Sequence, residues 1–316
     1  MKIKIIPYNI KYRKKILELW NQELITDPLS EKRFLEKILL DENFDPNYCL
    51  VALSEDNKVI GFIWSVVRKV PYGDRGTEPE RGWIASIFVD KDYQRQGIGS
   101  QLVNTVEEKM INKGIKNITL GAYSPNYLFP GIDKNNYSNA IPFFEKLGYE
   151  KHGEAVSMER SLFDFVKTQR YLDLYEKVLK KGYTLTSFSL DDAEELLEFL
   201  HTHFEGGWAR NIQNAILNDK AHETVLVLRD SENEIVGYAQ RAIDGSPDRF
   251  GPFGVMEKLR GEGLGAVLFN EMLFDMLSKG ISHAYFLWTS GNAQKFYERN
   301  GMNVYRDYNL MKKYIN

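Results

Sequence analysis

One loop pattern occurs twice in this chain and constrains the fold more than any other feature. The first copy spans residues 89–102 and the second spans residues 255–268. Each copy reads Val, four residues, Gln or Arg, two residues, Gly, one residue, Gly. The valine and both glycines of the first copy lie 166 positions before their counterparts. Because the pattern is duplicated at constant spacing, we expect two related domains in tandem.

The repeat continues beyond the loop. Residues 113–115 match residues 279–281 at the same spacing, whereas residues 139–148 match residues 292–301 at a spacing of 153. The first copy therefore holds 13 extra residues between about Gly121 and Ser138, and ten more fall in residues 68–81, where the composition predicts a long hairpin loop. A chain of 316 residues also exceeds one typical core. We expect an N-terminal domain over residues 1–160 and a C-terminal domain over residues 183–316.

Residues 161–182 have no counterpart in the first copy. Apolar residues stand among charged ones there, and the composition is not that of a flexible Gly/Ser linker. We interpret this stretch as a connecting helix whose apolar face packs against one or both domains. Further helices are predicted after each loop, because Ile98, Leu102, Val106 and Met110 recur at helical spacing, as do their counterparts Leu264, Leu268, Met272 and Met276.

The chemistry of the repeated loop suits a phosphate group. Glycine can adopt positive φ and lets a ligand approach the backbone closely, and the N-terminus of the following helix offers free N–H groups. Arg260 adds a cation in the second copy, and Gln94 stands at the same place in the first. A dinucleotide-binding loop would need a third glycine where both copies have leucine, and a Walker loop would need Gly-Lys-Ser/Thr. An ordinary glycine-rich turn is the remaining alternative, which the duplication disfavours.

The net charge and the cysteine content restrict which binding partners and which cellular compartment we expect. The net charge of -3 gives no electrostatic reason to expect nucleic acid or an anionic membrane as the main partner. Cys49 is the single cysteine, which favours a reducing compartment and a buried, inert thiol. No apolar run approaches a signal peptide or a membrane span. We expect a cytoplasmic protein, as a monomer or homodimer, without membrane contact.

Both loops resemble motif A of the GCN5-related N-acetyltransferases, the GNAT family, whose Q/R-x-x-G-x-G/A loop binds the pyrophosphate of coenzyme A. Residues 139–148 and 292–301 resemble the family's motif B, whose helix flanks the thioester end of the coenzyme. The resemblance spans nearly all of both halves. It implies an α/β fold of the α+β type with two tandem GNAT-like domains. Each would be a mixed, mostly antiparallel twisted sheet flanked by helices, with two strands splayed apart around acyl-coenzyme A.

The resemblance implies acetyl-CoA as the cofactor. We expect no metal site, because the residues offer no convincing set of ligands. The pantetheine is expected to lie beside the strand that ends at Val89 or Val255. In the first half, the coenzyme-binding residues that we expect are Phe88, Val89, Gln94, Arg95, Gln96, Gly97, Ile98, Gly99, Ser100, Asn139 and Phe143. In the second half they are Val255, Arg260, Gly261, Glu262, Gly263, Leu264, Gly265, Ala266, Asn292 and Phe296.

The resemblance also implies transfer of an acyl group to a small-molecule amine or a peptide amino group. In the family a tyrosine of motif B often protonates the leaving thiolate, and Tyr297 holds that position in the second half. Phe144 replaces it in the first half and has no proton to give. We therefore expect the second half to carry most of the turnover. Two alternatives stay open: a noncatalytic acyl-CoA-binding or sensing protein, and the N-terminal domain as the working half.

Acceptor-binding residues are less strongly indicated. Glu205 and Trp208 lie between the first helices of the second half, where they could contact an amine, although a surface loop with one packed tryptophan fits as well. Tyr123 and Tyr127 belong to the 13-residue insertion and could form an acceptor wall or cover a domain interface. The nearby histidines at 201 and 203 are not a convincing metal pair, because they point apart on a helix.

Overall fold

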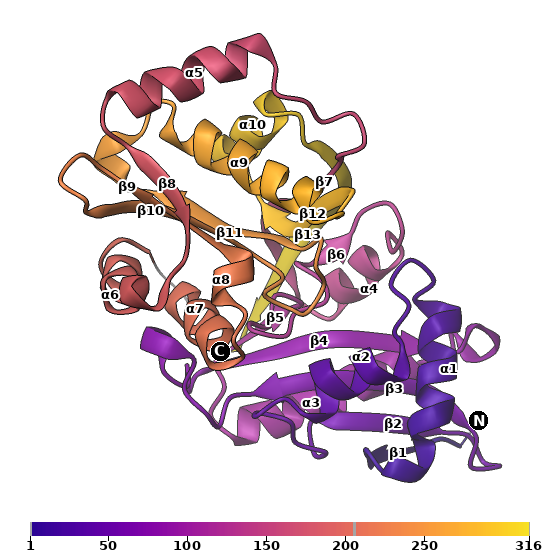
Figure 1. Cartoon of the computed structure of the whole chain (residues 1–316). Helices are drawn as coiled ribbons and strands as arrows, with labels where there is room; N and C mark the ends of the chain where they lie inside the picture. The colour runs from indigo at the N-terminus through magenta and orange to yellow at the C-terminus, as the bar shows by residue number, and fades with distance from the viewer. Residues whose placement is uncertain (1, 205–206, 316) are drawn as a thin grey trace. The chain divides into compact units, whose positions relative to one another are not determined.

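The computed structural model describes residues 2–204 and 207–315, which form two compact units (Figure 1). The first unit holds the residues up to Ala155 together with those from Arg306 onward. The second holds Val156–Tyr305. Among the described residues, no helix is both long enough and apolar enough to span a bilayer.

The sheet of the first unit is mixed. Strands β1 (Lys4–Pro7), β2 (Cys49–Leu53), β3 (Val59–Val67) and β4 (Arg81–Val89) pair antiparallel in that order. Strand β4 then pairs parallel with β5 (Asn117–Leu120). Strand β13 (Asn303–Tyr314) pairs antiparallel with β5 and with the short strand β6 (Ile132–Asp133). The last strand of the chain thus lies in the same sheet as the first strands, next to β5.

Helices cover both faces of this sheet. Helix α3 (Ile98–Asn112) packs on one face with the buried side chains of Leu50, Ile63 and Ile84. Helices α1 (Arg13–Glu23) and α2 (Glu31–Phe34), followed by a π-helical turn at Leu35–Leu39, cover the other face. Helix α4 (Ala140–Lys146) packs beside α3. The ten-residue insertion forms the predicted long hairpin loop between β3 and β4, with a 3-10 turn at Gly73–Arg75.

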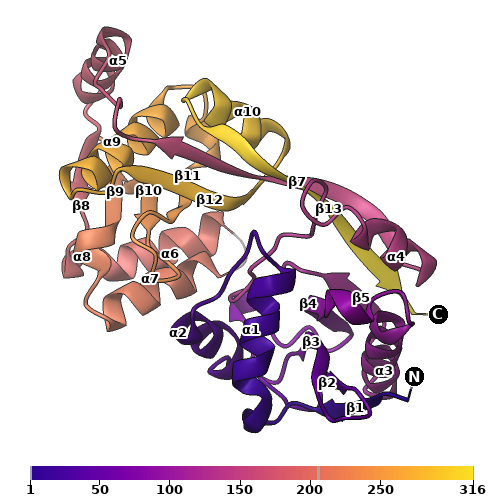
Figure 2. The same ribbon diagram turned by 90° about the vertical axis from the view of Figure 1, so that its right-hand side faces the viewer.

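The second unit repeats this plan. Strands β8 (Thr184–Ser187), β9 (Val225–Arg229), β10 (Ile235–Arg241) and β11 (Phe250–Val255) form an antiparallel sheet. Strand β12 (His283–Thr289) pairs with the second part of β7 (Glu150–Ser161). The helices are α5 (Gln169–Lys180), α6 (Ala193–His203), α7 (Trp208–Leu217), α8 (Ala221–Thr224), α9 (Leu264–Ser278) and α10 (Gly291–Arg299), and Figure 2 shows them from a second side.

The fold class expected from the sequence is confirmed, since both units have mostly antiparallel sheets with flanking helices and β4 pairs parallel with β5 in the first. The helices after the two loops bury the expected stripes: Ile98, Leu102, Val106 and Met110 are at most 2% exposed, and Leu264, Leu268, Met272 and Met276 at most 1%. Cys49 is buried, and this burial raises the pKa of its thiol. Most of β13 belongs to the first unit, where it pairs with β5 and β6, although the C-terminal domain expected over residues 183–316 contains this strand.

Candidate functional site

The first repeated loop joins β4 to α3. Gly97 is the N-cap of α3 with φ 81°, and Arg95 also has positive φ, so the loop folds back under the start of the helix. The Gln94 side chain donates to the Val89 carbonyl at 2.9 Å and thereby ties the loop to the strand end. Arg95, Gln96 and Gly97 are exposed, and a Cβ added to Gly97 would meet only the far end of Gln101, at 3.9 Å. This open cradle at a helix N-terminus fits a pyrophosphate group.

The second loop has the same backbone form. Gly261 and Gly263 have φ 92° and 90°, and Gly263 is the N-cap of α9. Arg260 makes an ion pair with Glu257 at 3.0 Å, in which the side chains are 65% and 85% exposed. Such an exposed pair is weak, so the guanidinium is free to turn toward an anion. Glu262 is paired with Lys181 at 2.8 Å.

The last glycine of each loop brings motif A and motif B together. A Cβ added to Gly99 would lie 3.2 Å from the ring of Phe143 on α4, and one added to Gly265 would lie 3.7 Å from the ring of Phe296 on α10. The absence of a side chain at Gly99 therefore makes room for the Phe143 ring, whereas a Cβ at Gly265 would be in ordinary van der Waals contact with Phe296. The structure thus places motif B beside the loop in both units.

Several of the expected coenzyme residues can act only through their backbone. The side chains of Phe88, Ile98 and Leu264 are 5%, 2% and 1% exposed and belong to the cores. Ser100 and Ala266 are half-buried in the first turns of their helices. Asn139 and Asn292 are exposed at the start of α4 and α10.

A free strand edge lies next to the first loop. Strand β4 pairs with β5 from Arg81 to Ile84, and within the described chain this pairing does not continue past Ile84. The Asp90 N–H donates to Ile60 on β3, so the alternation along a strand directs the backbone groups of Ile87 and Val89 toward the opposite, free edge. An extended pantetheine can use these groups as an added strand would.

The second unit has an equivalent edge. Arg249, the residue before β11, forms an isolated parallel bridge with Tyr285 on β12. The Met256 N–H donates to Val236 on β10, so the backbone groups of Phe253 and Val255 face the gap between β11 and β12. Both units therefore have the splayed strands that the resemblance implied.

Tyr297 lies in this gap of the second unit. Its ring is 4.4 Å from the ring of Phe286 on β12 and 5.8 Å from that of Phe253 on β11. Burial among these rings raises the pKa of Tyr297, and nearby Arg249 offsets only part of the rise. The phenol is therefore protonated at neutral pH, which is the form that a proton donor needs.

The equivalent position in the first unit has no such chemistry. Phe144 is 4% exposed and packs against Phe143 and Tyr149 in the core, with ring centroids 5.0 and 5.2 Å away. The two halves thus share the loop and the free strand edge but differ at the motif B hydroxyl.

The aromatic residues of the first unit's insertion are placed differently from one another. Tyr123 has no exposed surface, and its hydroxyl donates to Asp41 at 2.8 Å and accepts from Asn43 at 2.9 Å. The structure therefore places Tyr123 in the core, where it presents no surface to an acceptor. Tyr127 is half-buried.

In the second unit, Trp208 lies beside the free edge. Its ring stacks on Phe204 at 4.6 Å, and both rings press on Gly254 of β11, where an added Cβ would be 2.4 Å from Phe204 and 3.2 Å from Trp208. Glu205 lies outside the described residues. Sequence analysis missed Phe204 and also Tyr238, whose buried hydroxyl has no hydrogen-bond partner among the described residues. The sequence signal for Phe204 is that it and Trp208 are aromatic residues on either side of residues 205–207.

Comparison with known proteins agrees with this geometry. The model of the acetyltransferase (GNAT) family matches residues 13–149, and that of an acetyltransferase (GNAT) domain matches residues 189–312. N-alpha-acetyltransferase 30 of Schizosaccharomyces pombe (strain 972 / ATCC 24843) is 29% identical over 147 residues, covering 46% of this chain and 83% of the relative.

Two solved structures share the fold over nearly the whole chain. The GCN5-related glucosamine N-acetyltransferase region of a fungal multi-domain GH3 beta-N-acetylglucosaminidase has a TM-score of 0.82 at 19% identity, covering 98% of this chain. This chain spans 38% of that longer protein. A GCN5-related N-acetyltransferase from Sphaerobacter thermophilus has a TM-score of 0.74 at 16% identity, covering 99% of this chain and 95% of the other. The chain belongs to the GNAT family of N-acetyltransferases, with one acetyltransferase domain in each half.

Proposed function

We propose that this enzyme transfers an acetyl group from acetyl-CoA to a small amine or to a peptide amino group, and that its second half carries most of the turnover. The observation that carries the proposal is the position of Tyr297 between the rings of Phe253 on β11 and Phe286 on β12. Its neighbour Phe296 lies beside Gly265 of the loop. A protonated phenol beside a free strand edge can donate to a leaving thiolate.

Other residues of the second half have supporting roles. The loop N–H groups and Arg260 would hold the pyrophosphate, and the backbone of Phe253 and Val255 would align the pantetheine. Bound acetyl-CoA supplies the acetyl group as a thioester. The backbone N–H groups on the free edge of β11 are donors for negative charge that develops on the acyl oxygen. Trp208, Phe204 and the unpartnered hydroxyl of Tyr238 form the adjoining wall that we assign to the acceptor.

A second assignment of the working half is favoured by a different observation. The loop at Gly97 is open, and the first half has its own free strand edge at Ile87 and Val89. If this half turns over, it does so without a motif B hydroxyl, which is chemically feasible because a thiol of pKa about 8.5 is already a fair leaving group.

Thiol release from acetyl-CoA in the presence of an amine panel tests the activity. The panel contains peptides with free N-termini and glucosamine, because the named relatives act on such amines. Absence of acceptor-dependent thiol release over the whole panel, in protein that binds coenzyme A, would favour the noncatalytic coenzyme-binding alternative.

The variant Tyr297→Phe tests the working half. We expect kcat to fall by about 100-fold with little change in the KM for acetyl-CoA, because only proton donation is lost. Tyr305→Phe removes a hydroxyl from a 36%-exposed ring in the same unit and is the control. Full kcat in Tyr297→Phe, when the chemical step limits the rate, would refute the assignment and favour the first half.

A further inference from the structure

The two loops have the same backbone form but different surroundings. The N-cap glycines have φ and ψ of 81° and 2° at Gly97 and of 90° and -7° at Gly263. Space beside Gly97 is open, whereas a Cβ added to Gly263 would lie 2.6 Å from the Cδ1 atom of Leu174. A leucine methyl group therefore lies directly against the second loop, on the side that glycine leaves free.

Leu174 belongs to α5, the helix that has no counterpart in the first half. Tyr171, Leu174, Tyr175 and Val178 form one apolar stripe at helical spacing, and this stripe faces α9. Just after the helix, Lys181 pairs with Glu262 at 2.8 Å. Adjacent loop residues, Glu262 and Gly263, are thus both contacted by the connecting segment.

The contact is incompatible with an anion at the same place. A pyrophosphate must come within hydrogen-bond distance of the N–H groups of the loop, and the Leu174 methyl group fills space against Gly263 that is open beside Gly97. A pyrophosphate that uses this space at the second loop requires Leu174 to move.

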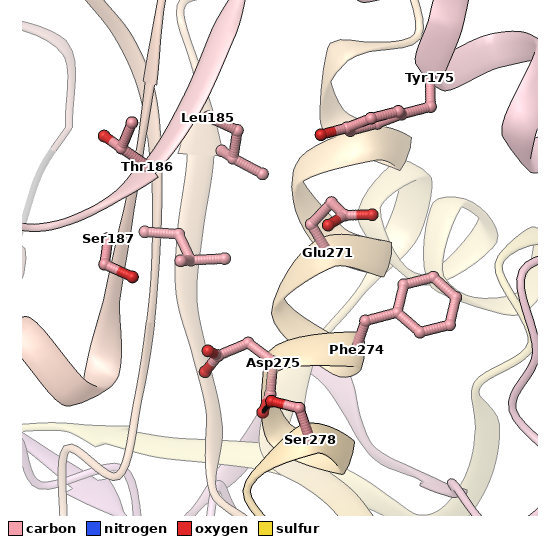
Figure 3. Close-up of a pocket in the computed structure, with 9 residues that line it drawn as sticks. Tyr175, Leu185, Thr186, Ser187, Glu271, Phe274, Asp275 and Ser278 are labelled. Atoms are coloured by element: carbon pink, nitrogen blue, oxygen red, sulfur yellow. Dashed lines mark hydrogen bonds between the residues drawn. The ribbon is translucent and has the colours of Figure 1, made fainter.

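The helix is held in a way that permits such movement. The side chains of Lys181 and Glu262 are 44% and 34% exposed, so their ion pair is weak. A cavity of about 310 Å³ lies beside α5 and is lined by Tyr175, by residues of β8 and by Glu271 and Phe274 of α9 (Figure 3). Tyr175 borders this cavity and has room to shift, whereas Val178, one turn beyond Leu174, is 2% exposed and packs in the core.

Firm anchors lie at the start of the helix. The Tyr171 hydroxyl donates to Glu271, Lys167 pairs with Glu271 at 3.1 Å, and Phe165 stacks on Phe274 at 4.4 Å. These contacts hold the N-terminal end of α5 on α9, and the buried Val178 holds its C-terminal part, so the movement that uncovers Gly263 is a local displacement of Leu174 and Tyr175.

We propose that α5 is a latch over the coenzyme loop of the second half. With the latch closed, acetyl-CoA binds first at the open loop of the first half, and the second loop fills only when Leu174 has left Gly263. This inference rests on the proposed function, because it concerns coenzyme access to the half that holds Tyr297. The latch makes turnover depend on the position of the connecting helix.

Titration of the full-length protein with coenzyme A tests the latch. Calorimetry gives stoichiometry and affinity, and hydrogen exchange of peptides covering residues 94–100 and 260–266 assigns each binding event to a loop. In the wild type, we expect the first peptide to be protected at lower coenzyme concentrations than the second. Leu174→Ala should tighten binding at the second loop by about tenfold, because less apolar contact must be displaced, and should leave the first loop unchanged.

Matched variants separate the latch from general loosening of the helix. Leu172→Ala removes a side chain that is 39% exposed on the same helix, and it should leave both affinities unchanged. Lys181→Gln releases the second contact and should tighten the second loop by about twofold, as expected for a weak pair. Equal protection of both loops in the wild type, or unchanged or weaker binding at the second loop in Leu174→Ala, would overturn the latch. Weaker binding would show instead that α5 is part of the coenzyme site.

These outcomes are distinct from failure of the proposed function. Two equivalent sites in the wild type, with turnover that depends on Tyr297, would refute the latch alone. Absence of coenzyme binding at both loops in every variant would refute both proposals.

Discussion

Replacing Arg306 by leucine tests how the last strand is held in the first unit. The Arg306 Nε donates to Asp133 at 2.6 Å, and Nη2 donates to Asp27 at 2.8 Å. The three side chains are 10%, 0% and 14% exposed, so these are buried ion pairs. Arg306 lies on β13, whose neighbouring residues Tyr308 and Asn309 pair with β6. The cluster therefore connects the C-terminal strand to two distant segments of the first unit.

The expected loss follows from what remains after the substitution. Removing one partner of a buried ion pair costs about 3–5 kcal/mol, because the other charge stays buried. Asp133 keeps hydrogen bonds from the N–H groups of Asn135 and Asn136, and Asp27 is partly exposed, so the lower end of the range applies. We expect the free energy of unfolding of the first unit to fall by about 3 kcal/mol.

Urea unfolding followed by tryptophan fluorescence measures this change. Trp20, Trp64 and Trp83 all lie in the first unit and are at most 1% exposed, so they report its unfolding. Lys134→Ala breaks neighbouring pairs with Glu154 and Asp307, whose side chains are 53% and 40% exposed, and should cost less than about 1 kcal/mol. An Arg306→Leu protein within 1 kcal/mol of the wild type would refute the view that this buried cluster holds β13.

Three further predictions concern the same unit and its loop. Burial alone would raise the pKa of Asp133, but hydrogen bonds from Asn136, Arg306 and Asn135 outweigh it and hold this pKa below its usual value. Asp133 therefore contributes stability above its unfolded pKa of about 3.9, and this contribution is lost as pH falls through the lower folded pKa. Acid titrations of the free energy of unfolding should show a smaller loss below about pH 4 in Arg306→Leu than in the wild type. Equal losses would contradict the role of Arg306 in lowering the pKa of Asp133. Gly131→Ala should lower the free energy of unfolding, measured in urea, by about 2 kcal/mol, because the added Cβ would lie 2.3 Å from the backbone oxygen of Asn309. An unchanged urea midpoint would contradict the close approach of Gly131 to Asn309. Gly97→Val should weaken coenzyme A binding at the first loop by at least about tenfold in calorimetry, and unchanged affinity in a folded variant would refute the phosphate-loop interpretation.

Local sequence patterns predicted much of the fold. The duplicated loop at constant spacing predicted two related domains, and the apolar stripes after each loop predicted the buried faces of α3 and α9. These predictions hold because helical periodicity and glycine conformation are decided within a few residues. The same locality made the long hairpin loop between β3 and β4 recognisable, since turn residues act on their own backbone.

Contacts between residues far apart in the chain could not be read in this way. The strand β13 pairs with β5 and β6, whose residues lie about 170 or more positions earlier in the chain, and no local pattern identifies such partners. Likewise, the sequence indicated that Tyr123 could form an acceptor wall or cover a domain interface, whereas its hydroxyl lies buried between Asp41 and Asn43. The two N-cap glycines are equivalent by sequence and by backbone angles, yet the tertiary structure leaves Gly97 open and puts Leu174 against Gly263. Sequence determined the loops and the chemistry that they can offer, whereas the packing of distant segments decided which of them a ligand can reach, because burial is set by the whole fold and not by the residue itself.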